Sequence, residues 1–330
     1  MLHHCKPDLL NSISFHDDQR CTVAVAGGTT AIGGAIVKAL EKDGSHHCVI
    51  LSRSTSDDPR ILSVDYSDPE SLQRILEEHN IHTVISAVTL QTDVSGQSQL
   101  NLIEAADRSK VTKRFMPSEF GANYDSSHLA ALPLYAWKFK AIDRLEASSL
   151  EYTLFSNAMF MDYWFSRHIP SAFNFNIPSW VDLDNNFAAI PAGGDTPLVL
   201  THSTDIGQFV VRVLGLDKWE KRYFLVGDRL TLNEFLRIAE EIKGVTFERH
   251  DDTMESLMKG ECTILPAAAS SLPAGFELGD FMKTIAAAGS WVANGGLDLP
   301  TEGTLNTMFP DIETLKVREA VNIYFSRQQD

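Results

Sequence analysis

Residues 22–33 of the chain read TVAVAGGTTAIG, a short apolar, β-branched run followed by a glycine-rich turn. The run Thr22–Ala26 is typical of a buried strand, and Gly27-Gly28 ends it. Beyond the turn, apolar residues recur at helical spacing, at positions 32, 36, 37 and 40. A strand, a tight turn and a helix in this order favour a dinucleotide-binding fold, because such a turn lets a pyrophosphate approach the helix N-terminus.

Short apolar runs alternate with amphipathic stretches as far as Phe155. Five more runs predict strands at Cys48–Leu51, Ile61–Val64, Thr83–Val88, Arg114–Met116 and Tyr152–Phe155. The stretches between them predict helices, one of which has Asp68 as its N-cap and Pro69 as its first residue. We therefore expect an α/β protein with a Rossmann-type, doubly wound parallel sheet and right-handed connections.

The alternation weakens after Phe160 and returns in pieces. It predicts strands at Pro197–Thr201 and Tyr223–Val226, a helix at Thr204–Leu214, and a helix that opens on the capping box Thr231–Glu234. Further helices are expected around Asp252–Lys259, Leu278–Ala288 and Ile312–Phe325. We expect a dinucleotide-binding domain over residues 20–158, to which residues 197–243 partly return. A smaller, mixed α/β substrate-binding region is expected over residues 159–330.

The composition disfavours several classes of partner. The chain of 330 residues has 28 Lys+Arg against 44 Asp+Glu, a net charge of −16. Binding to nucleic acid or to an anionic membrane depends on basic residues, so neither is expected. No apolar stretch is long enough for a signal-peptide core or a membrane span, which favours a cytoplasmic protein. The four cysteines lack metal-ligand spacing, and no metal site is expected.

The glycine turn and the ends of two predicted strands form the expected cofactor site. Turn residues expected to contact the cofactor are Gly27, Thr29, Thr30, Ala31, Ile32 and Gly33. Ser52-Arg53 follows the second strand where NAD-binding proteins place a carboxylate. An arginine can bind the 2′-phosphate of NADP, so NADPH or NADP+ is favoured over NAD, although a solvated surface arginine is the alternative. Ser86, Ala87 and Val88 are expected to line the nicotinamide side.

The stretch RFMPSEFG at residues 114–121, followed by Lys138 on a helix and a strand that begins at Tyr152-Thr153, resembles the isoflavone-reductase-like (NmrA-like) family of atypical short-chain dehydrogenases. FMDYW at 160–164, VGDRLTLNE at 226–234 and NTMFPDI at 306–312 are similar to fungal members in particular. The resemblance covers roughly residues 20 to 325. It implies that NADPH is the cofactor and that Lys138 is the family's lysine, with Lys140 as a solvated neighbour.

Other candidates surround Lys138, each with a structural alternative. Tyr135 is a candidate proton donor, with packing as its alternative. Ser118 is a candidate for orienting a substrate carbonyl, with capping of the loop as its alternative. Five residues are candidates for an apolar substrate pocket, although core packing explains most of them as well: Phe120, Phe160, Met161, Tyr163 and Trp164.

These features predict an NADPH-dependent reductase of a small, largely apolar, oxygen-bearing metabolite in a secondary-metabolite pathway. The substrate is a ketone or an activated double bond, and Lys138 stabilises the developing oxyanion. A non-catalytic, NADP-sensing NmrA-like regulator is the main alternative, and a non-redox enzyme on the same fold is another. The expected partner is a small-molecule substrate, and a homodimer is one possible oligomeric state.

Overall fold

The computed structural model describes residues 20–29, 31–123, 133–174, 178–270 and 277–327. Its centre is a six-stranded parallel sheet with the strand order β3-β2-β1-β4-β5-β6. The order reverses beside β1, as in a doubly wound fold, so the predicted fold class is confirmed. The strands are β1 (Thr22–Ala26), β2 (His47–Ser52), β3 (Ile61–Ser63), β4 (Ile81–Ser86), β5 (Arg114–Met116) and β6 (Glu151–Tyr152).

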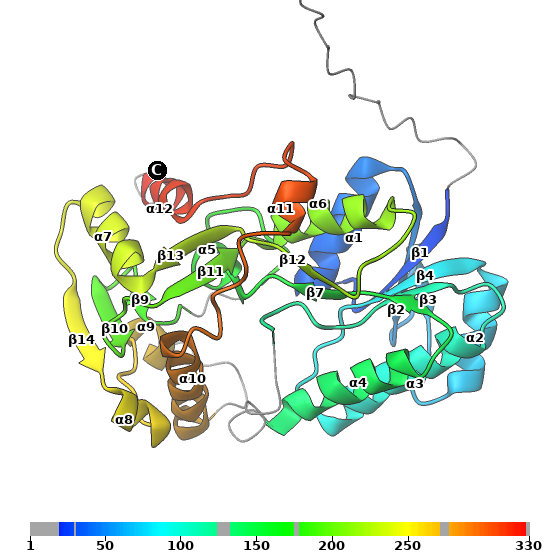
Figure 1. The fold of residues 1–330 in the computed structure, drawn as a ribbon, viewed down its shortest axis with the longest axis horizontal. Helices are drawn as coiled ribbons and strands as arrows, with labels where there is room; N and C mark the ends of the chain where they lie inside the picture. The colour runs from blue at the N-terminus through cyan, green and yellow to red at the C-terminus, as the bar shows by residue number, and fades with distance from the viewer. Residues whose placement is uncertain (1–19, 30, 124–132, 175–177, 271–276, 328–330) are drawn as a thin grey trace, which may run out of the picture.

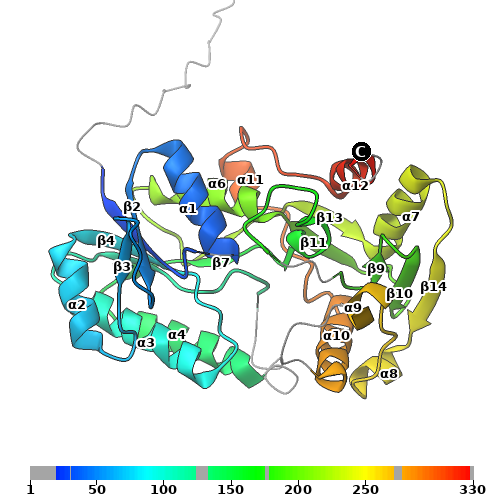
Figure 2. The same ribbon diagram turned by 180° about the vertical axis from the view of Figure 1, so that it is seen from behind.

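Helices cover both faces of this sheet (Figures 1 and 2). One face carries α1 (Ala31–Asp43) and α6 (Ser203–Leu214), and the other carries α2 (Pro69–Glu78), α3 (Asp93–Arg108) and α4 (Ala136–Glu146). Side chains of β1 alternate between the two layers, as they must in an extended strand. Val23 and Val25 pack with residues of α1 and α6, whereas Ala24 and Ala26 pack with residues of α2, α3 and α4.

The prediction of one strand over Tyr152–Phe155 was wrong, because the structure has two strands in this region. Tyr152, in β6, pairs with Phe115 of the central sheet. The next strand, β7 (Leu154–Ser156), instead pairs in parallel with β12 (Arg222–Phe224). The chain leaves the edge of the central sheet at Thr153 because the segment that includes β12 supplies the hydrogen-bond partners of β7. The strand predicted over Thr83–Val88 is shifted by two residues, since β4 begins at Ile81 and ends at Ser86.

The rest of the chain builds two small mixed sheets. Their strand orders are β14-β10-β9 and β13-β11-β8, with one parallel and one antiparallel pair in each. The strands are β8 (Met159–Phe160), β9 (Val181–Asp182), β10 (Phe187–Pro191), β11 (Pro197–Thr201), β13 (Asp228–Thr231) and β14 (Glu248–Asp252). These sheets agree with the smaller, mixed α/β part expected from the sequence.

Several further helices accompany these sheets. They are α5 (Asp162–Phe165), α7 (Leu232–Lys243), α8 (Met254–Met258), α9 (Pro266–Ser270), α10 (Leu278–Ala293), α11 (Leu305–Met308) and α12 (Val317–Ser326), together with the 3-10 turn η3 (Pro133–Tyr135). The predicted caps are confirmed: the Asp68 side chain accepts from two backbone amides of α2, and Thr231 forms a capping box with Glu234 at the start of α7. The predicted helix Ile312–Phe325 begins only at Val317.

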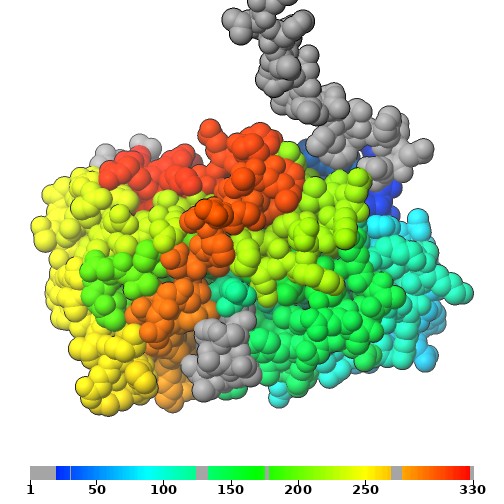
Figure 3. All heavy atoms as spheres, in the orientation of Figure 1, coloured from blue at the N-terminus to red at the C-terminus, as the bar shows by residue number. Residues whose placement is uncertain are grey.

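Two later segments connect the C-terminal half to the central six-stranded sheet. Helix α6 lies so close to α1 that a Cβ atom at Gly207 would lie 2.8 Å from the carbonyl oxygen of Ala35. The segment that follows α10, orange to red in Figure 3, runs over the junction between the two parts of the molecule. Leu305 and Phe309 from that segment join the core on the α1 and α6 side.

Candidate functional site

The glycine turn between β1 and α1 packs directly against the end of β4. Gly27 has a φ of +77°, and a Cβ atom there would lie 2.7 Å from the carbonyl oxygen of Ala87. A Cβ atom at Gly33 would lie 2.2 Å from the carbonyl oxygen of Gly27. The Ala87 amide donates to the Ala26 carbonyl at 2.8 Å. Only glycine therefore allows this turn to close while it stays in contact with β4.

The N-terminus of α1 contacts a segment that is distant in the sequence, around Ala172. Ala31, with a φ of +48°, donates its amide to the carbonyl oxygen of Ala172 at 3.0 Å. A Cβ atom on Gly34 would lie 3.1 Å from Ala172 Cβ, so the segment around Ala172 lies against the first turn of the helix. The amides of a first helical turn lack partners inside the helix and favour an anion. Ile32 belongs to this first turn of α1, and Thr29 lies in the glycine turn before it, whereas Thr30 lies outside the described residues.

The end of β2 carries the two residues predicted to select the cofactor. Ser52 is half-buried, and its hydroxyl accepts the Ser54 amide at 3.1 Å. Arg53 is exposed and makes no hydrogen bond or ion pair with another described residue. Arg60 differs, because it is already paired with Asp58 and Glu41. Of these two arginines, Arg53 is the one whose guanidinium is available to a phosphate group.

Lys138 lies in the first turn of α4 with its side chain almost fully buried. Its Nζ donates to the carbonyl oxygen of Ser118 at 3.1 Å and lies 3.7 Å from Glu119 Oε1. Burial lowers the pKa of Lys138, and the Glu119 carboxylate opposes that change. The Tyr135 ring centroid is 5.7 Å from the same nitrogen. Lys140 is exposed, with its Nζ 3.8 Å from the centroid of the Trp137 ring.

The ends of β4 and β5 are joined through Ser118. Its hydroxyl donates to the Val88 carbonyl at 2.9 Å, and its amide donates to Gln99 Oε1 at 2.8 Å. The hydroxyl of Ser118 thus has the geometry of the loop-capping alternative. Its carbonyl oxygen accepts the hydrogen bond from Lys138 Nζ. Ser86 is fully buried at the end of β4, and its hydroxyl has no hydrogen-bond partner in the described part of the chain.

The five residues predicted for a substrate pocket separate into different environments. Phe160 and Tyr163 form an aromatic cluster with Phe173, with ring centroids 5.1 to 5.9 Å apart. Phe120 packs on Phe155 at 5.7 Å. Met161 and Trp164 are 0% and 1% exposed and belong to the core of the C-terminal half, which is the packing role that the sequence left open.

A buried polar network beside this cluster was not predicted from the sequence. The Asp162 carboxylate accepts hydrogen bonds from the Ser203 amide at 2.8 Å, the Ser203 hydroxyl at 2.6 Å and the Ser171 hydroxyl. His202 Nε2 lies 3.5 Å from Asp162 Oδ1. Asp162 thus links α5 and the start of α6 to the segment that contacts α1. A carboxylate inside the aromatic run FMDYW is the signal that could have revealed this network, because a buried charge needs donors.

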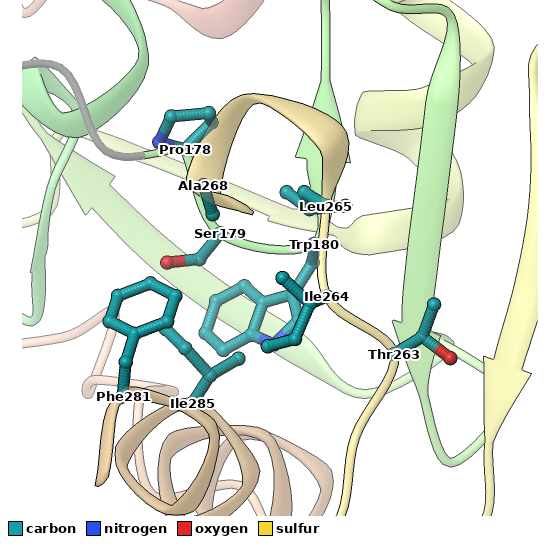
Figure 4. Close-up of a pocket in the computed structure, with 9 residues that line it drawn as sticks. All are labelled: Pro178, Ser179, Trp180, Thr263, Ile264, Leu265, Ala268, Phe281 and Ile285. Carbon is teal, nitrogen blue, oxygen red and sulfur yellow. The ribbon is translucent and has the colours of Figure 1, made fainter. Parts of the chain in front are cut away.

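A separate recess lies among β9, α9 and α10. It is shallow and open to solvent, and none of the residues that line it is a predicted site residue. Figure 4 shows the Trp180 indole at its centre, with Phe281 and Ile285 of α10 beside it. Among the described residues, no group of three or more His, Cys, Asp or Glu could hold a metal ion. No described helix is both long and apolar enough to cross a membrane.

The sheet order and the glycine turn place this chain in the Rossmann-type class of α/β proteins. The sequence profile of the NmrA-like family matches residues 19–270. The chain therefore belongs to the NmrA-like family, as its motifs predicted.

Two relatives match almost the whole chain. Oxidoreductase BOA1 of Botryotinia fuckeliana is 36% identical over 301 residues, which cover 88% of this chain and 95% of BOA1. Oxidoreductase swnN of Metarhizium robertsii is 30% identical over 328 residues, which cover 90% of this chain and 95% of swnN. The binary complex of leucoanthocyanidin reductase with NADPH from Vitis vinifera has the same fold, with a TM-score of 0.71, 22% identity, and coverage of 92% of this chain and 99% of that chain.

Asp205, which is buried in the first turn of α6 and accepts the Leu315 amide at 2.9 Å, predicts a specific dependence of stability on pH. Burial raises the pKa of Asp205 from 3.8 to about 6, so the folded protein holds this proton more tightly than the unfolded chain does. The stability that Asp205 contributes is therefore complete below its unfolded pKa and is lost as the pH rises through its folded pKa. We expect this loss to amount to about 2 to 3 kcal/mol.

Asp205→Asn should remove that loss, because an amide does not ionise and can still accept the Leu315 amide. Urea unfolding of the wild type and of Asp205→Asn between pH 4 and 7 checks this, with the exposed Asp280→Asn as a control. A constant difference in unfolding free energy between the wild type and Asp205→Asn across this range would contradict the prediction.

Proposed function

We propose that this chain is an NADPH-dependent oxidoreductase that reduces a small, largely apolar, oxygen-bearing metabolite, either a ketone or an activated C=C bond, in secondary metabolism. The observation that carries the proposal is the buried ammonium group of Lys138. It lies at the carboxyl edge of the central parallel sheet, whose first strand is followed by a glycine turn. In open α/β folds this edge is where ligands bind. BOA1 and swnN, which match nearly the full length, are named as oxidoreductases.

The residues present fit NADPH at three places. The glycine turn leaves no room for a Cβ atom at positions 27 and 33, so its backbone can approach a pyrophosphate closely. Arg53 is available to a 2′-phosphate at the end of β2. The Ser86 hydroxyl is buried without a described partner at the end of β4, where the nicotinamide half would lie. NADPH, when bound, supplies the hydride.

The role proposed for Lys138 follows from its position. The carbonyl of Ser118 and the carboxylate of Glu119 hold its ammonium group at the edge of the sheet. From there Lys138 can hydrogen-bond the nicotinamide ribose and donate to a substrate oxygen. Its positive charge would stabilise the negative charge that develops on that oxygen, and in a buried site this effect is large. Water or a hydroxyl group, with Tyr135 as the candidate, would complete the protonation.

The proposed division of labour follows the two parts of the chain. Residues 20–158, with 197–243 partly returning to them, would bind NADP(H), and residues 159–330 would bind the substrate. The aromatic cluster of Phe160, Tyr163 and Phe173, whose rings meet in tilted and edge-to-face contacts, supports an apolar substrate, because ligand pockets are lined mainly by apolar and aromatic side chains.

Lys138→Ala tests the function directly. Loss of a positioned acid typically costs about 10²- to 10⁴-fold in rate, so we expect kcat to fall by at least about 100-fold. NADPH oxidation followed by absorbance, with a panel of ketones and enones, gives the rates. Lys140→Ala, which removes an exposed lysine from the same helix, is the matched control and should keep wild-type turnover.

Two outcomes would overturn parts of the proposal. Full turnover in Lys138→Ala would remove this residue from the mechanism. NADPH binding by the wild type without turnover across a broad panel would instead favour an NADP-sensing regulator.

The proposed 2′-phosphate site predicts how Arg53 discriminates between cofactors. Arg53→Ala should raise the KM for NADPH about 10- to 100-fold, because hydrogen bonds to charged groups contribute about 1.5 to 3 kcal/mol. The KM for NADH should change little, because NADH has no 2′-phosphate. Arg60→Ala is the matched control, since Arg60 is already paired with Asp58 and Glu41. Equal changes in both KM values for Arg53→Ala would show that Arg53 does not select the cofactor.

A further inference from the structure

We propose that Glu119 is a positioning residue that keeps the ammonium group of Lys138 charged and directed at the reacting oxygen. This inference rests on the proposed function and assigns a task to a residue of the PSEFG loop. Lys138 is the group that would touch the substrate, and Glu119 would act through it.

In the described part of the chain, the Glu119 carboxylate forms its ion pair with Lys138. Glu119 is only 2% exposed, and its Oε1 has no hydrogen bond that meets ordinary distance limits in the described structure. Among the described residues, the cation that pairs with that oxygen is Lys138 Nζ, at 3.7 Å. A buried carboxylate without compensation is costly, so a pair of opposite charges in this position stabilises both members. Glu119 also follows Ser118 directly, whose carbonyl accepts a hydrogen bond from the same ammonium group.

The charged neighbours of Lys138 act in opposite directions. Burial lowers the pKa of Lys138, and Arg222, from β12, lowers it further. Glu119, from the loop after β5, raises it. On its own helical segment, Lys138 faces the ring of Tyr135. Among these neighbours, Glu119 is the one whose charge opposes the lowering of the Lys138 pKa by burial and by Arg222. This opposition would keep Lys138 protonated at alkaline pH.

The test is the pH dependence of kcat/KM for Glu119→Gln, which keeps the shape of the side chain and removes its charge. A charge at this distance changes a neighbouring pKa by about one to three units. The alkaline limb of the profile, where Lys138 loses its proton, should therefore move to lower pH by about one unit or more. Glu119→Asp keeps the charge and should leave that limb near its wild-type position, even if the maximal rate falls.

A structural role would give another pattern. Glu119→Gln would then lose activity equally at every pH, and Glu119→Asp, which changes the shape more, would be the worse variant. Either result would overturn the proposal. Glu151→Gln is the matched control. It also removes a carboxylate that pairs with a cation, because Glu151 Oε2 lies 2.6 Å from Arg114 Nε, but this pair lies at the opposite end of β5 from Lys138. Its alkaline limb should not move.

A readout independent of turnover separates this inference from the proposed function. The ¹³Cε NMR signal of Lys138, assigned by its absence in Lys138→Arg, reports the protonation of the amine. In Glu119→Gln this titration should move down by the same one or more pH units. An unchanged titration would overturn the role of Glu119, even if the enzyme is active. A lowered titration in a protein that never oxidises NADPH would refute the proposed reaction and leave the coupling between Glu119 and Lys138 established.

Discussion

The close approach between the glycine turn and the end of β4 is the constraint on which the rest of the site depends. Gly27 and Gly33 bring β1, α1 and Ala87 within backbone contact, and no residue with a Cβ atom could take either position without displacing the others. This contact fixes the N-terminus of α1 beside the carboxyl ends of the central strands. From that edge the loop after β5 reaches Lys138. The proposed cofactor site and the proposed acid thus share one edge of the sheet.

The net charge of −16 means that the proposed cofactor site would need such a local arrangement. A strongly acidic protein that holds a polyanionic cofactor cannot rely on its overall field, which would repel the ligand. It must instead use backbone amides at a helix N-terminus and a small number of placed cations. In the proposed site, Arg53 at the end of β2 would be one of these cations. The buried pair of Lys138 and Glu119 follows the same principle, since each charge is compensated by a close neighbour.

Local signals explain what could be predicted from the sequence. The strand, turn and helix at residues 22–43, the cap at Asp68 and the capping box at Thr231 depend on neighbours within a few positions, and all three are present. The division between β6 and β7 was missed because the partner of β7 lies at Arg222–Phe224, far along the chain. The Asp162 network and the contact of Ala172 with α1 also join distant segments. Apolar periodicity carries no information about such pairings.

The central claim is that the glycine turn and Arg53 form a site for NADPH. Calorimetric titration of the wild-type protein with NADPH and with NADH tests it most directly. The account predicts that NADPH binds with one-to-one stoichiometry and at least about 10-fold more tightly than NADH, because only NADPH carries the phosphate that Arg53 would hold. Equal affinity for the two, or binding of neither, would contradict it.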